Sequence, residues 1–447
     1  MPSRKTYAVG SARTAQVILQ GLLKIQCVLL SLRMRKILTT SLLFLTLTCS
    51  AMSQDIQRGS FQHGLIPSRF QAAQNLRDES LSRNSRLEPH LTQGLNIPHP
   101  FFQTPDTVSI VIMGDMMMHR DQIANARIGE DTFDFSECFP RVEHLIKGAD
   151  IAVANMEFTL AGKPYTGYPC FSAPDSYAEE VAESGVDIFL TANNHILDKG
   201  RKGIERTLGT YSKMEKDGCV RHTGAAVSAM DDSLRFPLRV VSKGIRLALI
   251  NFTYGTNCGI REEYPKVHRI DTTEIADAIR RARESGADFI IALPHWGNEY
   301  VLRHSASQGR LARWLADKGC DAVVGAHPHV LQDIETMTVS SKNGVEVKEV
   351  PVVYSLGNFI SNMSAQNTQV GMMVTLRFTK DWLGNKNMLE PLLTLTWCSR
   401  PGNLTRGYTT IPIKEYVGKR KLWINPWDYD KMIASYERVK KETGIID

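Results

Sequence analysis

The sequence predicts an α/β fold in which helices cover both faces of a sheet. Three observations support this class. Short apolar runs alternate with helical patterns from about residue 107 onward. The apolar runs are nearly continuous, as in strands that are buried on both faces. Polar residues follow several of these runs directly, and ligand sites in such folds lie beyond the carboxyl ends of the strands.

Each expected strand is a short apolar run bounded by Gly, Asp, Asn or Ser, and each expected helix shows apolar residues at helical spacing. Two pairs of strands flank polar turns at residues 242–244 and 340–344 and are expected to form hairpins. The expected strands are residues 108–113, 150–154, 186–190, 238–241, 245–252, 287–293, 321–324, 331–338, 345–354, 370–378 and 392–397. The expected helices are residues 138–147, 175–184, 201–216, 272–284, 305–317 and 426–441.

The first 53 residues predict an export signal. They hold seven basic residues and no Asp or Glu. A basic segment at residues 33–36 precedes an apolar run at residues 37–48, which is too short to span a membrane. Ala51-Met52-Ser53 forms a small-x-small cleavage site, and Met34 is a second candidate start. Lipidation at Cys49 and an uncleaved membrane anchor stay open as alternatives.

The folded body is close to neutral once this leader is set aside. Of the 53 Lys and Arg residues, seven lie in the leader, so 46 basic residues face 47 acidic ones in the remainder. A nucleic-acid partner is therefore not expected. Export would permit disulfides. The absence of any CxxC pair argues against a zinc ribbon or a thioredoxin-type site, and a single bridge between Cys170 and Cys258 stays open.

We expect four segments along the chain. Residues 1–53 form the leader. Residues 54–105 are rich in Gln, Ser, Arg and Asn with little periodicity, which is typical of a tether or a loosely packed arm. Residues 106–415 form the folded domain, and residues 416–447 form a helical extension.

Polar groups at five strand ends are the candidate functional residues. Because parallel strands present their carboxyl ends at one edge of a sheet, we expect these groups to share one pocket. They are Asp115, Asn155 with Glu157, Asn193 to His195, His295 with Glu299, and His327 with His329.

Asp, Asn, Glu and His together suit a divalent cation such as manganese, iron or zinc, with one or two ions bound. Two ions would activate water and hold a phosphoryl oxygen, and a histidine that is not a ligand could protonate the leaving oxygen. Two alternatives stay open: the same groups could bind a polar substrate without any metal, or Asp115 could be the acid or base of a metal-free hydrolase.

The motifs that carry these residues resemble the capsule-synthesis protein CapA family, which is associated with poly-gamma-glutamate capsules. The resemblance runs in order from about residue 107 to residue 360. It implies a metallophosphoesterase-like β-sandwich with helices flanking both sheets, a four-layer αββα arrangement. The motifs are Gly114-Asp115, Ala154-Asn155-Met156-Glu157, Thr191-Ala192-Asn193-Asn194-His195-x-x-Asp198-x-Gly200, His295-Trp296-Gly297-x-Glu299-Tyr300 with Gln308, Gly325-x-His327-Pro328-His329-Val330 and Tyr354-Ser355-Leu356-Gly357-Asn358-Phe359.

The resemblance also implies roles for individual residues. His195 is the expected leaving-group acid, and Glu157 and Glu299 are further catalytic candidates. Trp296, Tyr300 and Asn358 are candidates for binding substrate, with core packing as the alternative for the two aromatic residues. The expected metal ligands are Asp115, Asn155, Asn194, His295, His327 and His329.

Five positions depart from the pattern of the resemblance. Asn193 stands before the Asn-His pair where that pattern has Gly, and Ile196 stands after it where the pattern has Asp or Glu. Met117 stands where phosphoesterases carry a histidine two residues after the first aspartate, and His119 lies two residues further on. Ala326 replaces a histidine, and His304 replaces a proline.

The expected function is therefore that of an exported CapA-like protein of the periplasm or envelope. It would act in the biosynthesis of a capsule, of poly-gamma-glutamate or of another envelope polymer, through a metal-assisted, phosphoesterase-like hydrolase pocket. The alternatives are a non-catalytic component that binds the polymer or assembles its export machinery, and an amide hydrolase acting at gamma-glutamyl bonds. The expected partners are an anionic envelope polymer or phosphoester substrate and a capsule synthesis complex at the membrane.

Overall fold

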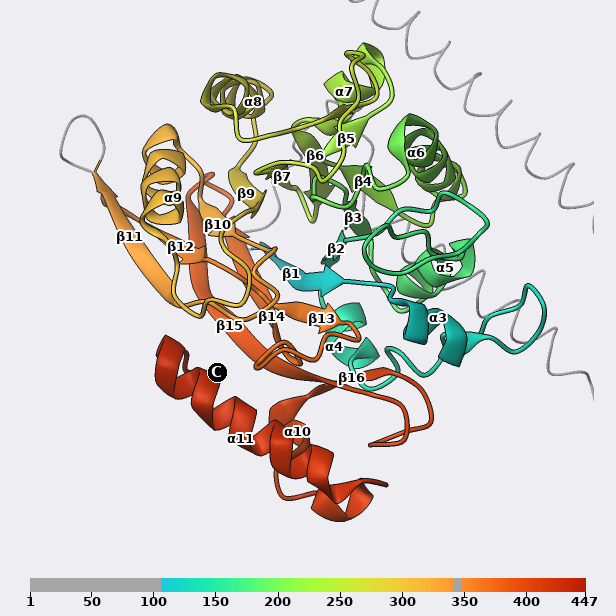
Figure 1. The fold of residues 1–447 in the computed structure, drawn as a ribbon. Helices are drawn as coiled ribbons and strands as arrows, with labels where there is room; N and C mark the ends of the chain where they lie inside the picture. Colours follow the sequence, from blue (N-terminus) through green and yellow to red (C-terminus); the bar gives the residue numbers. More distant parts are fainter. Residues whose placement is uncertain (1–105, 341–346) are drawn as a thin grey trace, which may run out of the picture. The chain divides into compact units, whose positions relative to one another are not determined.

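The computed structural model describes residues 106–340 and 347–447. The predictions for the leader and the tether lie outside these ranges, as does most of the polar turn predicted at residues 340–344. The described part contains two large sheets and one short two-stranded sheet, with helices beside the large sheets (Figure 1). None of its helices is both long enough and apolar enough to cross a membrane.

The first large sheet has eight strands in the order β16-β15-β14-β1-β2-β3-β4, with β13 pairing on the end of β1. Strands β1 to β4 run parallel, whereas β14 to β16 are antiparallel to their neighbours. The bounds are β1 Asp106–Met116, β2 Ile151–Met156, β3 Ile188–Leu190, β4 Arg221–Thr223, β13 Asn358–Ile360, β14 Val370–Lys380, β15 Lys386–Ser399 and β16 Thr409–Pro412.

The second large sheet has six strands in the order β11-β12-β10-β9-β7-β6. Its centre is parallel, and an antiparallel hairpin lies at each edge, as the two polar turns predicted. The bounds are β6 Leu238–Ser242, β7 Ile245–Thr253, β9 Phe289–His295, β10 Ala322–Val324, β11 Ile334–Ser340 and β12 Val347–Val353. The short sheet pairs β5 Ala225–Ala226 with β8 Lys266–Val267.

The two large sheets pack face to face. Because successive side chains of a strand point to opposite faces, β1 divides its apolar residues between two cores. Ile110 and Ile112 enter a core shared with Leu249 and Ile291 of the second sheet. Val111 and Met113 enter a different core, formed with the helices outside the first sheet. The nearly continuous apolar runs in the sequence arise from this double burial.

Helices complete the outer layers. On the first sheet these are α3 Arg120–Ala126, α4 Glu143–Gly148, α5 Asp175–Glu183 and α6 Gly200–Lys216. On the second sheet they are α8 Thr272–Glu284 and α9 Ala306–Lys318. The expected four-layer αββα sandwich is therefore confirmed. The helix α7 Ala229–Arg235 precedes β6.

Local capping signals explain two of the helix starts. The Asp271 carboxylate accepts hydrogen bonds from the backbone of Thr273 and Glu274 and starts α8. Ser305 and Gln308 form a reciprocal capping box at the start of α9.

The last helix, α11 Pro426–Thr443, is two residues longer than predicted. Its apolar face includes Met432, Tyr436 and Val439, which join the core between the sheets. The chain reaches it through α10 Ile413–Tyr416 and the 3-10 helix η1 Arg420–Leu422. The expected boundary at residue 415 between domain and extension stays a prediction.

None of the six cysteines in the described ranges forms a disulfide, so the open alternative of a Cys170–Cys258 bridge is not formed here. Cys170, Cys219 and Cys258 are exposed, while the other three described cysteines are buried thiols.

Candidate metal centre

Two rows of residues, one at the end of each sheet, build the centre. In the first sheet, Asp115 lies in register between Asn155 of β2 and Asn358 of β13. In the second sheet, His295 pairs with Thr253 on one side and with Ala326 on the other. Because the sheets stack with these ends together, carboxylate, amide and imidazole groups from both sheets meet in one buried space.

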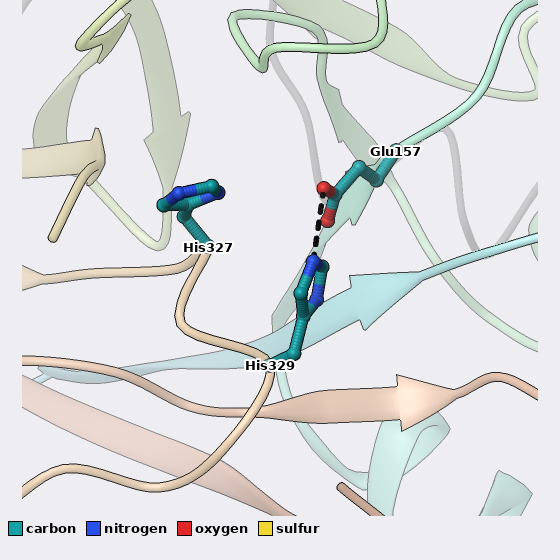
Figure 2. A group of neighbouring side chains, drawn as sticks. All are labelled: Glu157, His327 and His329. Carbon is teal, nitrogen blue, oxygen red and sulfur yellow. Dashed lines mark ion pairs between the residues drawn. The ribbon is translucent and has the colours of Figure 1, made fainter. Parts of the chain in front are cut away.

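Glu157 lies at the middle of this space. Its side chain is fully buried, and neither carboxylate oxygen has a hydrogen-bond partner. Its Oε1 lies 3.7 Å from Nε2 of His295 and 3.7 Å from Nε2 of His329. Figure 2 shows Glu157 facing His329, with His327 projecting from the same loop. A buried carboxylate without a partner is costly unless a cation compensates it.

Asp115 is held from both sheets. Its Oδ1 accepts a hydrogen bond from Asn155 Nδ2 at 2.7 Å, and its Oδ2 lies 3.3 Å from Nδ1 of His329 and 3.3 Å from the backbone nitrogen of His327. Asn358 Oδ1 lies 3.0 Å from the same Nδ1 of His329. These contacts fix the orientation of the His329 ring.

His295 bridges the predicted amide groups. Its Nδ1 lies 3.2 Å from Asn155 Nδ2, and its Nε2 lies 2.9 Å from Asn194 Oδ1. The Asn193 side chain donates to the Met156 carbonyl at 2.9 Å and so ties the Asn194 loop to β2. The structure therefore brings together all six predicted metal ligands. Five are linked by the contacts above, and the His327 ring lies next to those of His295 and His329.

The loop after β10 places the imidazoles of His327 and His329 in this space, and the backbone is strained at both residues. His327 and His329 have positive φ values of 103° and 59°, which side-chain-bearing residues rarely adopt. The loop starts at Gly325, where a Cβ atom would lie only 2.2 Å from the Tyr354 carbonyl oxygen. The His327 ring lies 4.8 Å from that of His295 and 5.8 Å from that of His329.

The titration behaviour of these groups suits a cation. Burial, with the nearby charges of His327 and His329, holds the pKa of His295 well below its usual range. Burial also lowers the pKa of His327 to about 3. Both rings are thus neutral at physiological pH, as metal ligands must be. Burial and then the charge of Asp115 raise the pKa of Glu157, a repulsion that a bound cation would relieve.

His329 behaves differently from the other two imidazoles. Burial alone would lower its pKa, but the hydrogen bond and charge of Asp115 outweigh this effect and raise it. Two sets of potential ligand atoms, each within 4.8 Å of one another, share Glu157: one adds His327 and His329, and the other adds Asp115 and His295. The residues therefore fit a divalent cation.

A third group of acidic and imidazole residues, Asp232, His268 and Glu274, lies outside this centre. The Lys266 ammonium forms ion pairs with both of its carboxylates. Its negative charge is therefore already balanced, and we assign it a structural role.

His195 stands beside the centre. Its Nδ1 lies 2.7 Å from Asp198 Oδ2, and the edge of its ring packs against Phe171, with the centroids 4.6 Å apart. The Phe171 backbone nitrogen also donates to Asp198 Oδ2 at 2.9 Å. Asp198 is part of the motif that contains His195, but the sequence analysis gave it no functional role.

The predicted substrate-binding residues differ in their surroundings. Trp296 is buried, and its indole N–H donates to the Tyr354 carbonyl at 2.9 Å. Tyr300 is half exposed at the rim, with its ring 6.3 Å from that of His329. Asn358 is buried in the first sheet, while Glu299 is exposed beside Tyr300. Burial and then the Glu299 charge raise the pKa of Tyr300 to about 12.

Tyr254 is a rim residue that the sequence analysis missed. It follows β7, and its ring lies 4.6 Å from that of His327. We expected β7 only as one half of a hairpin, whereas it also runs parallel to β9 and ends at the same edge. β9 ends in His295, and β7 is its parallel neighbour. The residue after β7 could therefore have been predicted to lie at the site.

A pocket of about 490 Å³ opens beside Tyr254. Apolar side chains, including Leu311 and Trp314, form part of its wall. Polar groups form the remainder, and Arg310 among them has no carboxylate within ion-pairing distance in the described ranges. Its size is that of a typical small-ligand site.

Three residues at or near the departures from the motif pattern make defined contacts. Met117 is buried and bonds to the Ile360 carbonyl through its backbone nitrogen. His119 caps α3 through Gln122. His304 stacks on Tyr354 with the ring centroids 3.8 Å apart.

Comparisons with known proteins agree with the motifs. Residues 109–363, more than half of the chain, match the family model of the bacterial capsule synthesis protein PGA_cap. The PGA biosynthesis protein CapA of Bacillus subtilis (strain 168) is 27% identical over 292 residues, which cover 62% of this chain and 70% of that protein. The capsule biosynthesis protein CapA of Bacillus anthracis is 28% identical over 282 residues, which cover 60% of this chain and 63% of that protein.

Solved structures show only a distant likeness. A putative 5'-nucleotidase from Staphylococcus aureus has a TM-score of 0.39 at 11% identity, covering 64% of this chain and 54% of that chain. The NAD nucleotidase of Haemophilus influenzae has a TM-score of 0.39 at 14% identity, covering 76% of this chain and 61% of that chain. Scores this low say nothing about activity. The family match has the greater weight, and the chain belongs to the bacterial capsule synthesis protein family PGA_cap.

Proposed function

We propose that this chain is a metal-dependent hydrolase of capsule biosynthesis that acts outside the cytoplasmic membrane on a phosphoester or on an anionic envelope polymer such as poly-gamma-glutamate. One observation carries the proposal. The fully buried Glu157 carboxylate has no hydrogen-bond partner and is surrounded by three imidazoles and a second carboxylate. A site that served packing alone would leave this charge without compensation.

The proposed metal ligands come from both sheets. Asp115, Glu157, His295, His327 and His329 would hold one or two ions of manganese, iron or zinc, with Asn155 and Asn194 as amide ligands or orienting groups. A divalent cation there would supply a Lewis acid that activates water and polarises the scissile group.

His195 is the candidate proton donor to the leaving group. Its Nδ1 lies 2.7 Å from the carboxylate of Asp198, and that contact fixes the orientation of the ring. The pocket of about 490 Å³ beside Tyr254 would receive the substrate, with Arg310 available to pair with an anionic group.

Metal analysis combined with a hydrolysis assay tests the proposal. The purified chain is stripped with a chelator, reloaded with manganese, iron or zinc, and assayed on a phosphodiester and on a gamma-linked glutamyl oligomer. We expect turnover that depends on the cation and is lost in His327→Ala and Glu157→Gln. His144→Ala is the matched control, because His144 is exposed and pairs only with Glu415. Cleavage of the glutamyl oligomer alone would identify an amide hydrolase.

A second candidate function is a non-catalytic component that holds an anionic polymer during export or assembly. The burial of Met117 where a further imidazole ligand would stand favours it, because this reduces the ligand set for a second ion. Polymer binding without turnover under every cation would support this candidate and contradict the first.

A further inference from the structure

We infer that residues 417–427, which we call the basic-aromatic segment, form a docking surface for anionic phospholipid. The segment includes η1 and the start of α11 and lies outside the residues that match the family model. The inference is independent of the proposed hydrolase activity, because none of these residues contacts the metal centre.

The segment concentrates exposed apolar side chains. Eighteen large hydrophobic side chains are exposed in the described ranges, and four of them fall within these eleven residues. Leu422 is 59% exposed, Ile424 is 63% exposed and Trp427 is 79% exposed, with Val417 as the fourth. Single exposed apolar residues are ordinary, whereas a cluster of them marks an interaction site.

The exposure does not arise from a loose backbone. Trp423, between Leu422 and Ile424, is buried, and its ring lies 5.8 Å from that of Tyr429 on α11. Arg420 forms two hydrogen bonds of 2.8 Å with Asp430. The Asn425 backbone nitrogen donates to the Asn403 carbonyl at 2.9 Å. The segment is therefore fastened at several points, with its apolar side chains turned outward.

The charges that accompany these side chains are basic. Lys419 and Lys421 are exposed, and neither has a carboxylate within ion-pairing distance in the described ranges. The acid next to Trp427 is turned inward: Asp428 is buried and accepts hydrogen bonds of 3.1 Å from Trp397 and Ser399. The local positive charge stands out because the body as a whole is nearly neutral.

This combination fits a lipid surface. Trp, Leu and Ile side chains enter the boundary between headgroups and acyl chains, while Lys side chains extend their ammonium groups to anionic headgroups. Each Lys near such a surface contributes about fivefold to binding. A second copy of the chain would cover the apolar side chains equally well but would bring the same two lysines against each other, whereas anionic headgroups would pair with Lys419 and Lys421, which form no ion pair in the described ranges.

Vesicle binding of the full chain tests the inference. Co-sedimentation is measured with vesicles of phosphatidylglycerol and phosphatidylethanolamine and with vesicles of phosphatidylcholine. The test variant carries Leu422→Ser, Ile424→Ser and Trp427→Ser. The matched control carries Trp382→Ser and Leu383→Ser, two exposed residues at the turn between β14 and β15. Every variant keeps the same leader, so differences between variants report on the segment.

We expect the triple variant to bind the anionic vesicles roughly tenfold less tightly, with the control unchanged. Lys419→Ser with Lys421→Ser should weaken binding to anionic vesicles and leave binding to phosphatidylcholine unchanged. Brominated lipid should quench tryptophan emission less in Trp427→Phe than in the unsubstituted chain. Equal binding by the triple variant and the unsubstituted chain would overturn the inference. A change in oligomeric state without any change in vesicle binding would also overturn it, because the surface would then join two copies of the chain.

Discussion

The Oε1 oxygen of Glu157 lies 3.7 Å from Nε2 of His329, beyond hydrogen-bonding distance, in a space from which solvent is excluded. Neither oxygen of this carboxylate has a hydrogen-bond partner. A carboxylate in this position weakens the fold when the centre holds no cation and is favourable when a cation is bound. The first prediction separates these two effects.

In chelator, Glu157→Gln should leave the free energy of unfolding unchanged or raise it by up to about 2 kcal/mol. The reason is that it replaces a buried unpaired acid with a neutral amide. The same change should abolish stabilisation by manganese or zinc. Urea unfolding with and without chelator measures both effects. Glu130→Gln, at an exposed position, is the control and should change neither quantity. A large loss of stability in chelator would show that the carboxylate is held by contacts other than a cation.

Cation loading should raise the thermal unfolding temperature. A ligand present at 100 times its dissociation constant stabilises the folded state by about 2.7 kcal/mol. Thermal scans of the stripped chain with added manganese, iron or zinc measure the shift and rank the ions. His329→Ala should lose the shift, whereas His144→Ala should keep it. An unchanged unfolding temperature with every ion would contradict a metal centre.

Acid should destabilise the chelated protein between about pH 6.5 and pH 3. Burial lowers the pKa of His327 to about 3, whereas an unfolded histidine titrates near 6.5. Within this window the unfolded state binds more protons, so stability falls as the pH falls. Urea midpoints at pH 7 and pH 5 test this. His327→Gln should show a shallower loss than the unsubstituted chain, and an equal loss in both proteins would remove His327 as the cause.

Asp198→Asn should lower kcat by roughly ten- to a hundredfold, because Asp198 orients His195. Cation binding should not weaken, because Asp198 contacts His195 and none of the predicted metal ligands. The defect should be larger for substrates with poor leaving groups, which need the proton more. Rates for phosphodiesters with alcohols of different pKa, together with calorimetric cation binding, test this. A uniform defect across leaving groups would contradict the proton-donor role.

Trp296→Phe should cost about 1–3 kcal/mol of stability, because the Tyr354 carbonyl would lose its buried hydrogen-bond donor. The KM for substrate should change little if the indole serves chiefly for packing. Chemical denaturation and steady-state kinetics distinguish this outcome from a binding role. Tyr300→Phe, at the exposed rim, supplies the comparison, since it should leave stability nearly unchanged.

The sequence predicted the elements with regular patterns and the residues at strand ends. The helix at residues 272–284 was predicted to the residue, because Asp271 caps its start and apolar residues recur at helical spacing. The convergence of Asp115, His295 and His327 was expected from their positions at strand ends, but these strands belong to two different sheets, so their meeting also depends on how the sheets stack. The helix expected at residues 138–147 begins instead at Glu143, after a turn that closes on Phe139.

Other features depend on contacts that no local pattern reveals. The three-residue strand β13 forms only because residues 358–360 pair with the end of β1. The pairing of Asn358 with His329 and the orientation of Tyr254 above His327 likewise require the two sheets to be stacked. The substrate and the number of ions depend on chemistry that neither the spacing of residues nor the fold specifies.

The ligand groups also come from distant parts of the chain, with Asp115 and His327 separated by 212 residues. The full set exists only once both halves of the polypeptide have been synthesised and have docked. An ion can therefore bind with the full ligand set only after both sheets have formed and packed together, so ion binding would report on the completion of folding.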